Sequence, residues 1–188
     1  MGVILSCCQH RTHTDYDPNP DPSTGLSHQD WFLLSKGRKK VLTKSTISDL
    51  FSKFLDDYPQ YSDMWATDQT YTDHMGHVIR HLSQLIDFSS VASSFAQVQD
   101  QISSSHYVHK VEAEAVRGFK DILLSDLPSL MGTHYCPEML ISWDRLLDAV
   151  IQPLTSQSDA WNLDPRGSLL NQMADKGTDG AEADQEEG

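Results

Sequence analysis

Two histidines, His74 and His106, have the residue type and the placement that metal chemistry requires. Each continues an apolar stripe that repeats every three to four residues, as one face of a helix does. Both imidazoles should therefore face the interior of the protein. Imidazoles on two facing helices can hold one flat iron macrocycle from opposite sides. The competing interpretation is a pair of core histidines whose ring nitrogens bond to backbone carbonyls. The stripes consist of Val78, Ile79, Leu82, Leu85 and Ile86 after His74, and of Phe95, Val98 and Ile102 before His106.

The elements that position these histidines are predicted to be helices. Ser27 is expected to cap a first helix, and Ser45 or Thr46 to begin a second. Pro59 suits the first turn of a short third helix. No segment keeps the period-two alternation of a half-buried strand for more than a few residues, so the predicted fold class is all-α. Pro128 should end or kink the helix in which it lies. The remaining helices are predicted at 71–91, 95–107, 112–131 and 137–155.

Length and charge limit the classes of protein that fit this chain. Its 188 residues, 38% of them hydrophobic, suit one domain at 26–156. We expect an anchor and proline-rich spacer at 1–25 and a disordered acidic tail at 157–188. The formal net charge of −13 argues against nucleic acid as a partner, because clustered Lys and Arg must neutralise a phosphate backbone. No run approaches the about 20 apolar residues that cross a bilayer, so no transmembrane segment is expected.

The N-terminus predicts attachment to a membrane by lipid. Gly2 and Ser6 fit the pattern for N-myristoylation. One myristoyl chain binds a membrane only marginally, whereas two acyl chains anchor a protein stably. Because Cys7 and Cys8 follow directly, we predict palmitoylation of one or both. The chain is therefore expected at the cytoplasmic face of the plasma membrane or of another membrane. The third cysteine, Cys136, is interpreted as structural or incidental.

Ordered residues over most of the chain resemble a known family. Two segments resemble animal globins, most closely those of the neuroglobin type or the membrane-attached globin X type. One runs from His106 to the last predicted helix. The other is Leu50-Phe51-Ser52-Lys53-Phe54-Leu55 followed by Tyr58-Pro59. The resemblance covers residues 26 to 155. It implies a globin fold, in which a helical sandwich surrounds a haem pocket. The matching residues after His106 are Val111, Phe119, Leu123, Leu124, Tyr135, Pro137 and Trp143.

The resemblance also implies roles for individual residues. His106 would be the proximal ligand of the iron in haem b, and His74 the distal ligand, with His77 as the alternative distal group. If His74 is distal, His77 would lie near the macrocycle edge, where globins often hold a propionate. Ser105 could accept a hydrogen bond from the second ring nitrogen of His106. The implied lining of the pocket is Phe51, Trp65, His77, Val78, Ile102 and Val111.

One stretch departs from the family pattern. Trp65 stands where globins nearly always have a phenylalanine, and an indole can also stack on a porphyrin. The connection from Trp65 to His74 is markedly shorter than in neuroglobin-type chains. In this connection few residues match the family pattern.

The function implied by this resemblance is that of a haem-binding globin with a bis-histidyl, six-coordinate iron. Such a protein binds O2, NO or nitrite and suits electron transfer with an unknown redox partner, sensing, or nitrite and NO chemistry at the membrane surface. A nitrite reductase or NO dioxygenase-like side activity is compatible with it. The alternative is a dual-acylated helical interaction protein that has lost haem binding.

Overall fold

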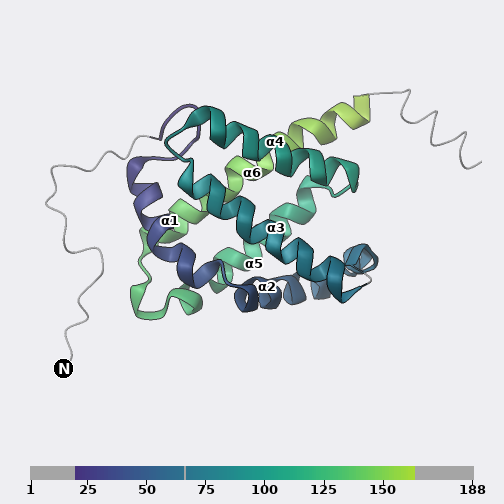
Figure 1. Cartoon of the computed structure of the whole chain (residues 1–188), viewed down its shortest axis with the longest axis horizontal. Helices are drawn as coiled ribbons and strands as arrows, with labels where there is room; N and C mark the ends of the chain where they lie inside the picture. Colours follow the sequence, from purple (N-terminus) through teal and green to yellow (C-terminus); the bar gives the residue numbers. More distant parts are fainter. Residues whose placement is uncertain (1–19, 66, 164–188) are drawn as a thin grey trace, which may run out of the picture.

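The computed structural model describes residues 20–65 and 67–163, and within them the chain forms helices and no strands (Figure 1). The predicted all-α class is therefore confirmed. The Pro-rich spacer before residue 20, the anchor residues and the tail after residue 163 lie outside the described residues. The elements are α1 (His28–Val41), α2 (Lys44–Asp57), the 3-10 helix η1 (Pro59–Trp65), α3 (Asp68–Asp87), α4 (Ala92–Val108), α5 (Ala113–Met131), the 3-10 helix η2 (Gly132–His134) and α6 (Pro137–Leu163).

Hydroxyl side chains begin the first helices, because the first backbone N–H groups of a helix lack a partner within it. Ser27 caps α1 as predicted, accepting from the backbone N–H of Asp30, while the Asp30 carboxylate accepts from the N–H of Ser27. The second helix begins earlier than predicted. Its cap is Thr43, whose hydroxyl accepts from the N–H of Thr46 at 3.1 Å. The short third helix begins at Pro59 as predicted.

Several other boundaries differ from the predicted ones. Helix α3 begins earlier than the predicted range 71–91, because the Thr67 hydroxyl caps it ahead of the apolar stripe. The helix also ends earlier, at Asp87. Pro128 does not end α5, which continues to Met131, the end of the predicted range 112–131, and stops where Gly132 adopts φ +54°. Helix α6 continues to Leu163, beyond the predicted end at 155, so the first residues of the expected tail are helical. Apolar periodicity locates helices, whereas caps and tertiary packing set their ends.

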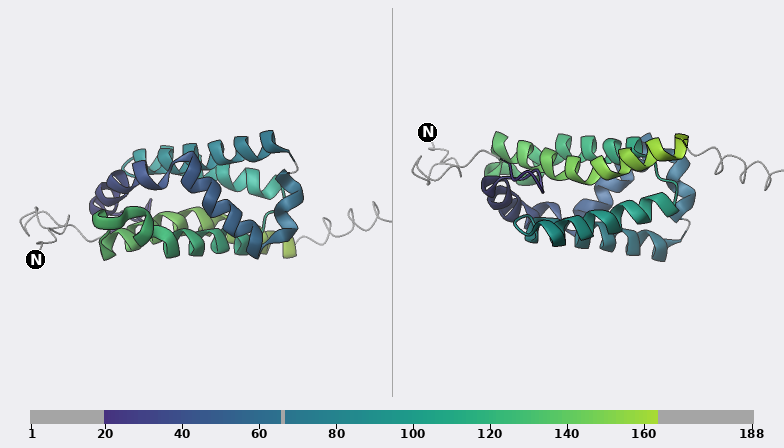
Figure 2. Two further views of the ribbon diagram at one scale, coloured as in Figure 1. Left: turned by 90° about the horizontal axis from the view of Figure 1, so that it is seen from below. Right: turned by 90° about the horizontal axis from the view of Figure 1, so that it is seen from above.

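Two helical layers enclose the core. Figure 2 shows α5 and α6 in green on one side and α3 and α4 in teal on the other. Helix α6 packs against α1, α4 and α5, while α2 packs against α3 and α5. All six α-helices contribute buried apolar side chains, and Trp143 and Phe95 are fully buried. Cys136 is buried as well, in agreement with a structural role. None of the described helices combines the length and apolar character needed to cross a bilayer.

Candidate functional site

His74 lies among aromatic side chains from three elements. It belongs to the second turn of α3, and its ring centre is 4.9 Å from that of Phe51 on α2 and 4.9 Å from that of Trp65 at the end of η1. The connection from Trp65 to His74, noted in the sequence as short, ends within α3, and the Trp65 ring contacts the His74 ring. The imidazole faces inward, as its stripe predicted.

Burial keeps the His74 ring uncharged. Removal from water lowers the pKa of His74 from 6.5 to about 4, and the positive charge of His106 and of three further histidines lowers it in the same direction. A charged imidazole is poorly solvated among aromatic rings, and nearby like charges oppose a second proton. At neutral pH the ring is therefore the unprotonated form that binds metals.

His106, in the last turn of α4, has one ring nitrogen committed to the protein. Its Nδ1 is 2.8 Å from the backbone carbonyl oxygen of Ile102. In the neutral ring Nδ1–H donates to that carbonyl, so the lone pair is on Nε2. Burial lowers the pKa of His106, the bond to Ile102 raises it, and the charge of His109 lowers it, with a net decrease. The ring therefore presents a neutral nitrogen for a metal.

The hydrogen-bond partner of His106 corrects one prediction. Ser105 was expected to accept from the imidazole, but Ser105 is exposed and the carbonyl of Ile102 takes that position. A helical side chain leans toward the preceding turn, which brings the ring nitrogen over the carbonyl four residues earlier. A backbone acceptor of this kind fixes the tautomer as a serine hydroxyl would have done.

The two histidines approach each other across neighbouring helices. Helices α3 and α4 pack together, and the charge of His106 acts on the pKa of His74. Figure 1 shows these two helices as neighbours on the near face of the molecule. The two imidazoles thus belong to helices that pack against each other. Their assignment as iron ligands remains a prediction.

The other predicted site residues fall into two groups. Phe51 and Ile102 are buried, and Trp65, Val78 and Val111 are half-buried against the core. His77, by contrast, is exposed and its ring lies 6.1 Å from that of His81, away from the aromatic group around His74. This difference favours His74 over His77 as the distal group, in line with the sequence-based preference.

One further aromatic residue at the site was not predicted to belong to it. The ring centre of Phe119 on α5 is 4.8 Å from that of Phe51, so it extends the aromatic group that surrounds His74. The available signal was the four-residue spacing of Ala115, Phe119 and Leu123, which places them on one buried face of α5. That spacing indicates a core position and does not by itself indicate which core residues touch the site.

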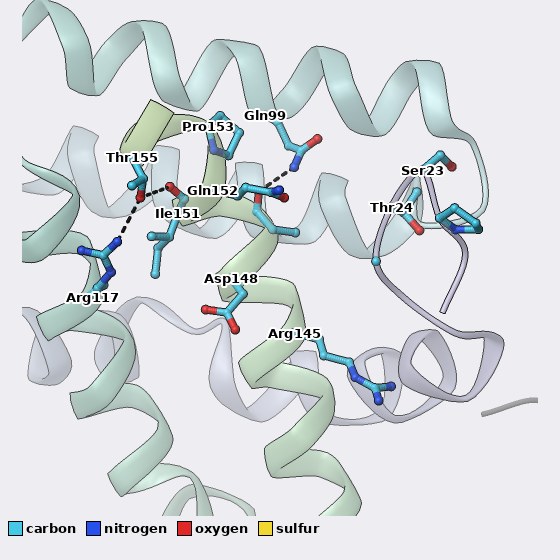
Figure 3. Close-up of a pocket in the computed structure, with 13 residues that line it drawn as sticks. Ser23, Thr24, Gln99, Arg117, Arg145, Asp148, Ile151, Gln152, Pro153 and Thr155 are labelled. Carbon is cyan, nitrogen blue, oxygen red and sulfur yellow. Dashed lines mark hydrogen bonds between the residues drawn. The ribbon is translucent and has the colours of Figure 1, made fainter. Parts of the chain in front are cut away.

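A separate hollow of about 590 Å³ lies between the segment before α1 and the helices α4, α5 and α6 (Figure 3). Its lining contains no histidine, and its two arginines already have partners. Arg117 bonds to Glu114 and Thr155, and Arg145 bonds to Asp30. This hollow is therefore distinct from the region of His74 and His106.

Comparison with known proteins identifies the family. The Globin family model matches residues 41–154, which is more than half of the chain and contains every residue discussed above as a candidate for the haem site. The chain belongs to the globin family. No significant match was found among curated individual proteins. The all-α architecture is thus a globin fold. Membership of this family supports binding of haem and of oxygen.

The residues of this globin suit haem. Two neutral imidazoles stand on adjoining helices, and one of them has its Nδ1 engaged by a carbonyl so that Nε2 carries the lone pair. Imidazole nitrogen is a preferred protein ligand of haem iron. The aromatic and aliphatic side chains of Phe51, Trp65 and Ile102 supply the apolar surroundings that a porphyrin requires.

Proposed function

We propose that this globin holds haem b between α3 and α4, with His106 as the proximal ligand and His74 as the distal ligand. The observation that carries the proposal is the hydrogen bond from Nδ1 of His106 to the Ile102 carbonyl. It commits one ring nitrogen and directs the other, together with its lone pair, away from the helix backbone. The same bond would satisfy one ring nitrogen of a core histidine, so the spectra described below separate the two interpretations.

The distal assignment is supported by the surroundings of His74. Its ring stays neutral well below neutral pH and lies against Phe51 and Trp65. We propose that Trp65 takes the part that a phenylalanine plays in other globins, and that Val78 and Val111 complete the apolar lining. His77, one turn further along α3 and exposed, would lie at the edge of the macrocycle.

Haem, when bound, supplies an iron ion that exchanges small ligands and carries an electron. His106 would hold the group, and the Ile102 carbonyl orients the His106 ring. His74 would compete with O2, NO or nitrite for the iron, so the apparent affinity for these ligands would decrease with the fraction of time that His74 is bound. This competition suits electron transfer, redox sensing or nitrite and NO chemistry better than bulk oxygen transport.

The test is the absorption spectrum of the full chain purified with haem supplementation. Wild type should show a Soret band and the split visible bands of bis-histidyl iron after reduction. His106→Ala should lose haem or retain it severely weakened, whereas His74→Ala should keep it in a five-coordinate state. His28→Ala removes an exposed imidazole on α1 and should leave the spectrum unchanged.

Three outcomes would contradict the assignment. If His74→Ala stays six-coordinate while His77→Ala becomes five-coordinate, His77 is the distal ligand. If neither His74→Ala nor His106→Ala changes the spectrum, both assignments are wrong. A colourless wild-type protein would favour a helical interaction protein without haem, for which the ring contacts of Phe51 and Trp65 with His74 at 4.9 Å would be permanent core packing.

We further propose that the globin acts at the cytoplasmic face of a membrane through acyl chains on Gly2 and on Cys7, Cys8 or both. The support is the sequence pattern alone, because these residues lie outside the described part of the chain. Attachment would keep the protein near membrane redox partners. Gly2→Ala should move a full-length fusion from the membrane pellet to the supernatant, and continued sedimentation of this variant would contradict the proposal.

A further inference from the structure

A second group of imidazoles lies on α3, outside the aromatic surroundings of His74. His77 and His81 are one helical turn apart, and their ring centres are separated by 6.1 Å with 32° between the ring planes. His77 is exposed and His81 is half-buried. Residues four apart on a helix stand above one another on the same face. Both rings are therefore near each other at a place that an ion in solution can reach.

We propose that His77 and His81 form a binding site for Zn²⁺, distinct from the iron ligands His74 and His106 and sharing only His77 with the proposed edge of the haem site. Two histidines at this spacing on one helix face are an arrangement by which proteins bind zinc. Zn–N bonds are about 2 Å long, which puts each ring centre roughly 3 Å from a shared ion. Two imidazoles on one tetrahedral ion have ring centres about 5 Å apart. The two rings, now 6.1 Å apart, would therefore have to move about 1 Å closer, and residues four apart on a helix are near enough for their side chains to do so.

The charge state of His81 suits a metal ligand. Burial lowers the pKa of His81, and the positive charges of Arg80, His77 and His106 lower it further. The His81 ring is therefore neutral at neutral pH, and zinc has no proton to displace there. The net charge of −13 over the whole chain also favours association with cations.

The site offers two protein ligands and not a closed shell. In the part of the chain that the structure describes, no three His, Cys, Asp or Glu side chains gather where they could hold one ion. Structural zinc sites have four protein ligands, whereas sites with fewer keep water at the open positions. Zinc at His77 and His81 would therefore retain water and exchange readily with the surroundings.

The experiment is a calorimetric titration of the full chain with ZnCl2, in haem-loaded and haem-free form. The variants are His77→Gln, His81→Gln and the double variant, and the matched control is His28→Gln, which removes an exposed imidazole on α1. Zinc is redox-inert, so the oxidation state of any bound haem is undisturbed. Comparison with the control separates this site from zinc taken up elsewhere, for example by Cys7 and Cys8.

We expect wild type and the control to bind one more zinc ion per chain than either single variant. The double variant should lose no more than each single one, because one imidazole alone cannot hold the ion. Zinc should also raise the melting temperature of wild type more than that of His77→Gln. Loss of the ion in both single variants, in either haem state, supports the site.

Equal zinc uptake by wild type, His77→Gln and His81→Gln in both haem states would overturn the proposal. So would a double variant that loses two ions, because the two rings would then bind separately. His77 is exposed, so its replacement leaves the core packing intact, and circular dichroism verifies this. If His81→Gln does not fold, the comparison of His77→Gln with the control decides the question.

Discussion

Gly118 on α5 lies directly beside the ring of Tyr58, which follows the last residue of α2. A Cβ atom at this position would lie 2.5 Å from Oη and 2.6 Å from Cζ of Tyr58, and closer still to Cε2. Tyr58 in turn stacks on Phe54, with ring centres 4.9 Å apart and 17° between the planes. Gly118→Ala therefore cannot be accommodated unless the Tyr58 ring moves off Phe54.

A matched control exists on another helix. Gly76 in α3 has no atom within 4 Å of the position that a Cβ would take. Replacing glycine by alanine inside a helix stabilises it by about 1 kcal/mol, and this gain applies to both sites. Overpacking costs about 1 to 3 kcal/mol, and it applies to Gly118 alone. The free energies of unfolding of the two variants should therefore differ by about 2 kcal/mol, with Gly76→Ala the more stable.

The measurement is denaturant unfolding of the haem-free chain followed by circular dichroism. Tyr58→Ala provides a second background, because it removes the ring that the new methyl group meets. In that background Gly118→Ala should stabilise the protein, as Gly76→Ala does. The reasoning is refuted if Gly118→Ala and Gly76→Ala give equal stabilities, or if the cost of Gly118→Ala persists without Tyr58.

Two further predictions concern charge. Because the pKa of His74 is about 4 in the folded chain and 6.5 otherwise, the unfolded state binds more protons between these values and stability falls as pH decreases through this window. For the haem-free wild type, the free energy of unfolding should decrease by at most about 3 kcal/mol on acidification to pH 4. The decrease should be smaller in haem-free His74→Phe, and equal pH dependence of the free energy of unfolding in the two proteins would contradict the prediction. The buried carboxylate of Asp30 accepts from Ser142 and Arg145, each at 2.8 Å. Asp30→Ala should lower the free energy of unfolding by about 2 kcal/mol, against less than about 1 kcal/mol for Asp87→Ala on the surface, and similar values for both would argue against this network.

Local information in the sequence was sufficient for the helices and for the direction of the two imidazoles. The apolar stripes predicted that His74 and His106 face inward, and the Ser27 cap was predicted at the correct residue. These features depend on neighbours three or four positions away, whose chemistry is visible in the chain itself. Helix ends were less predictable, as Thr43 shows, since several hydroxyl residues near a helix start can serve as the cap.

Tertiary structure decided how the site is arranged. Only packing brings Phe51, Trp65 and His74 from three elements into ring contact, and the burial that results is the largest cause of the lowered pKa of His74. The selection of the Ile102 carbonyl over Ser105 depended on the direction in which the His106 side chain leans. The sequence by itself determined which residues lie on inward helix faces, because periodicity is local. The folded chain decided which of those residues contact one another. Contacts between helices depend on the angle and the distance between the helix axes, and residue spacing along one helix encodes neither.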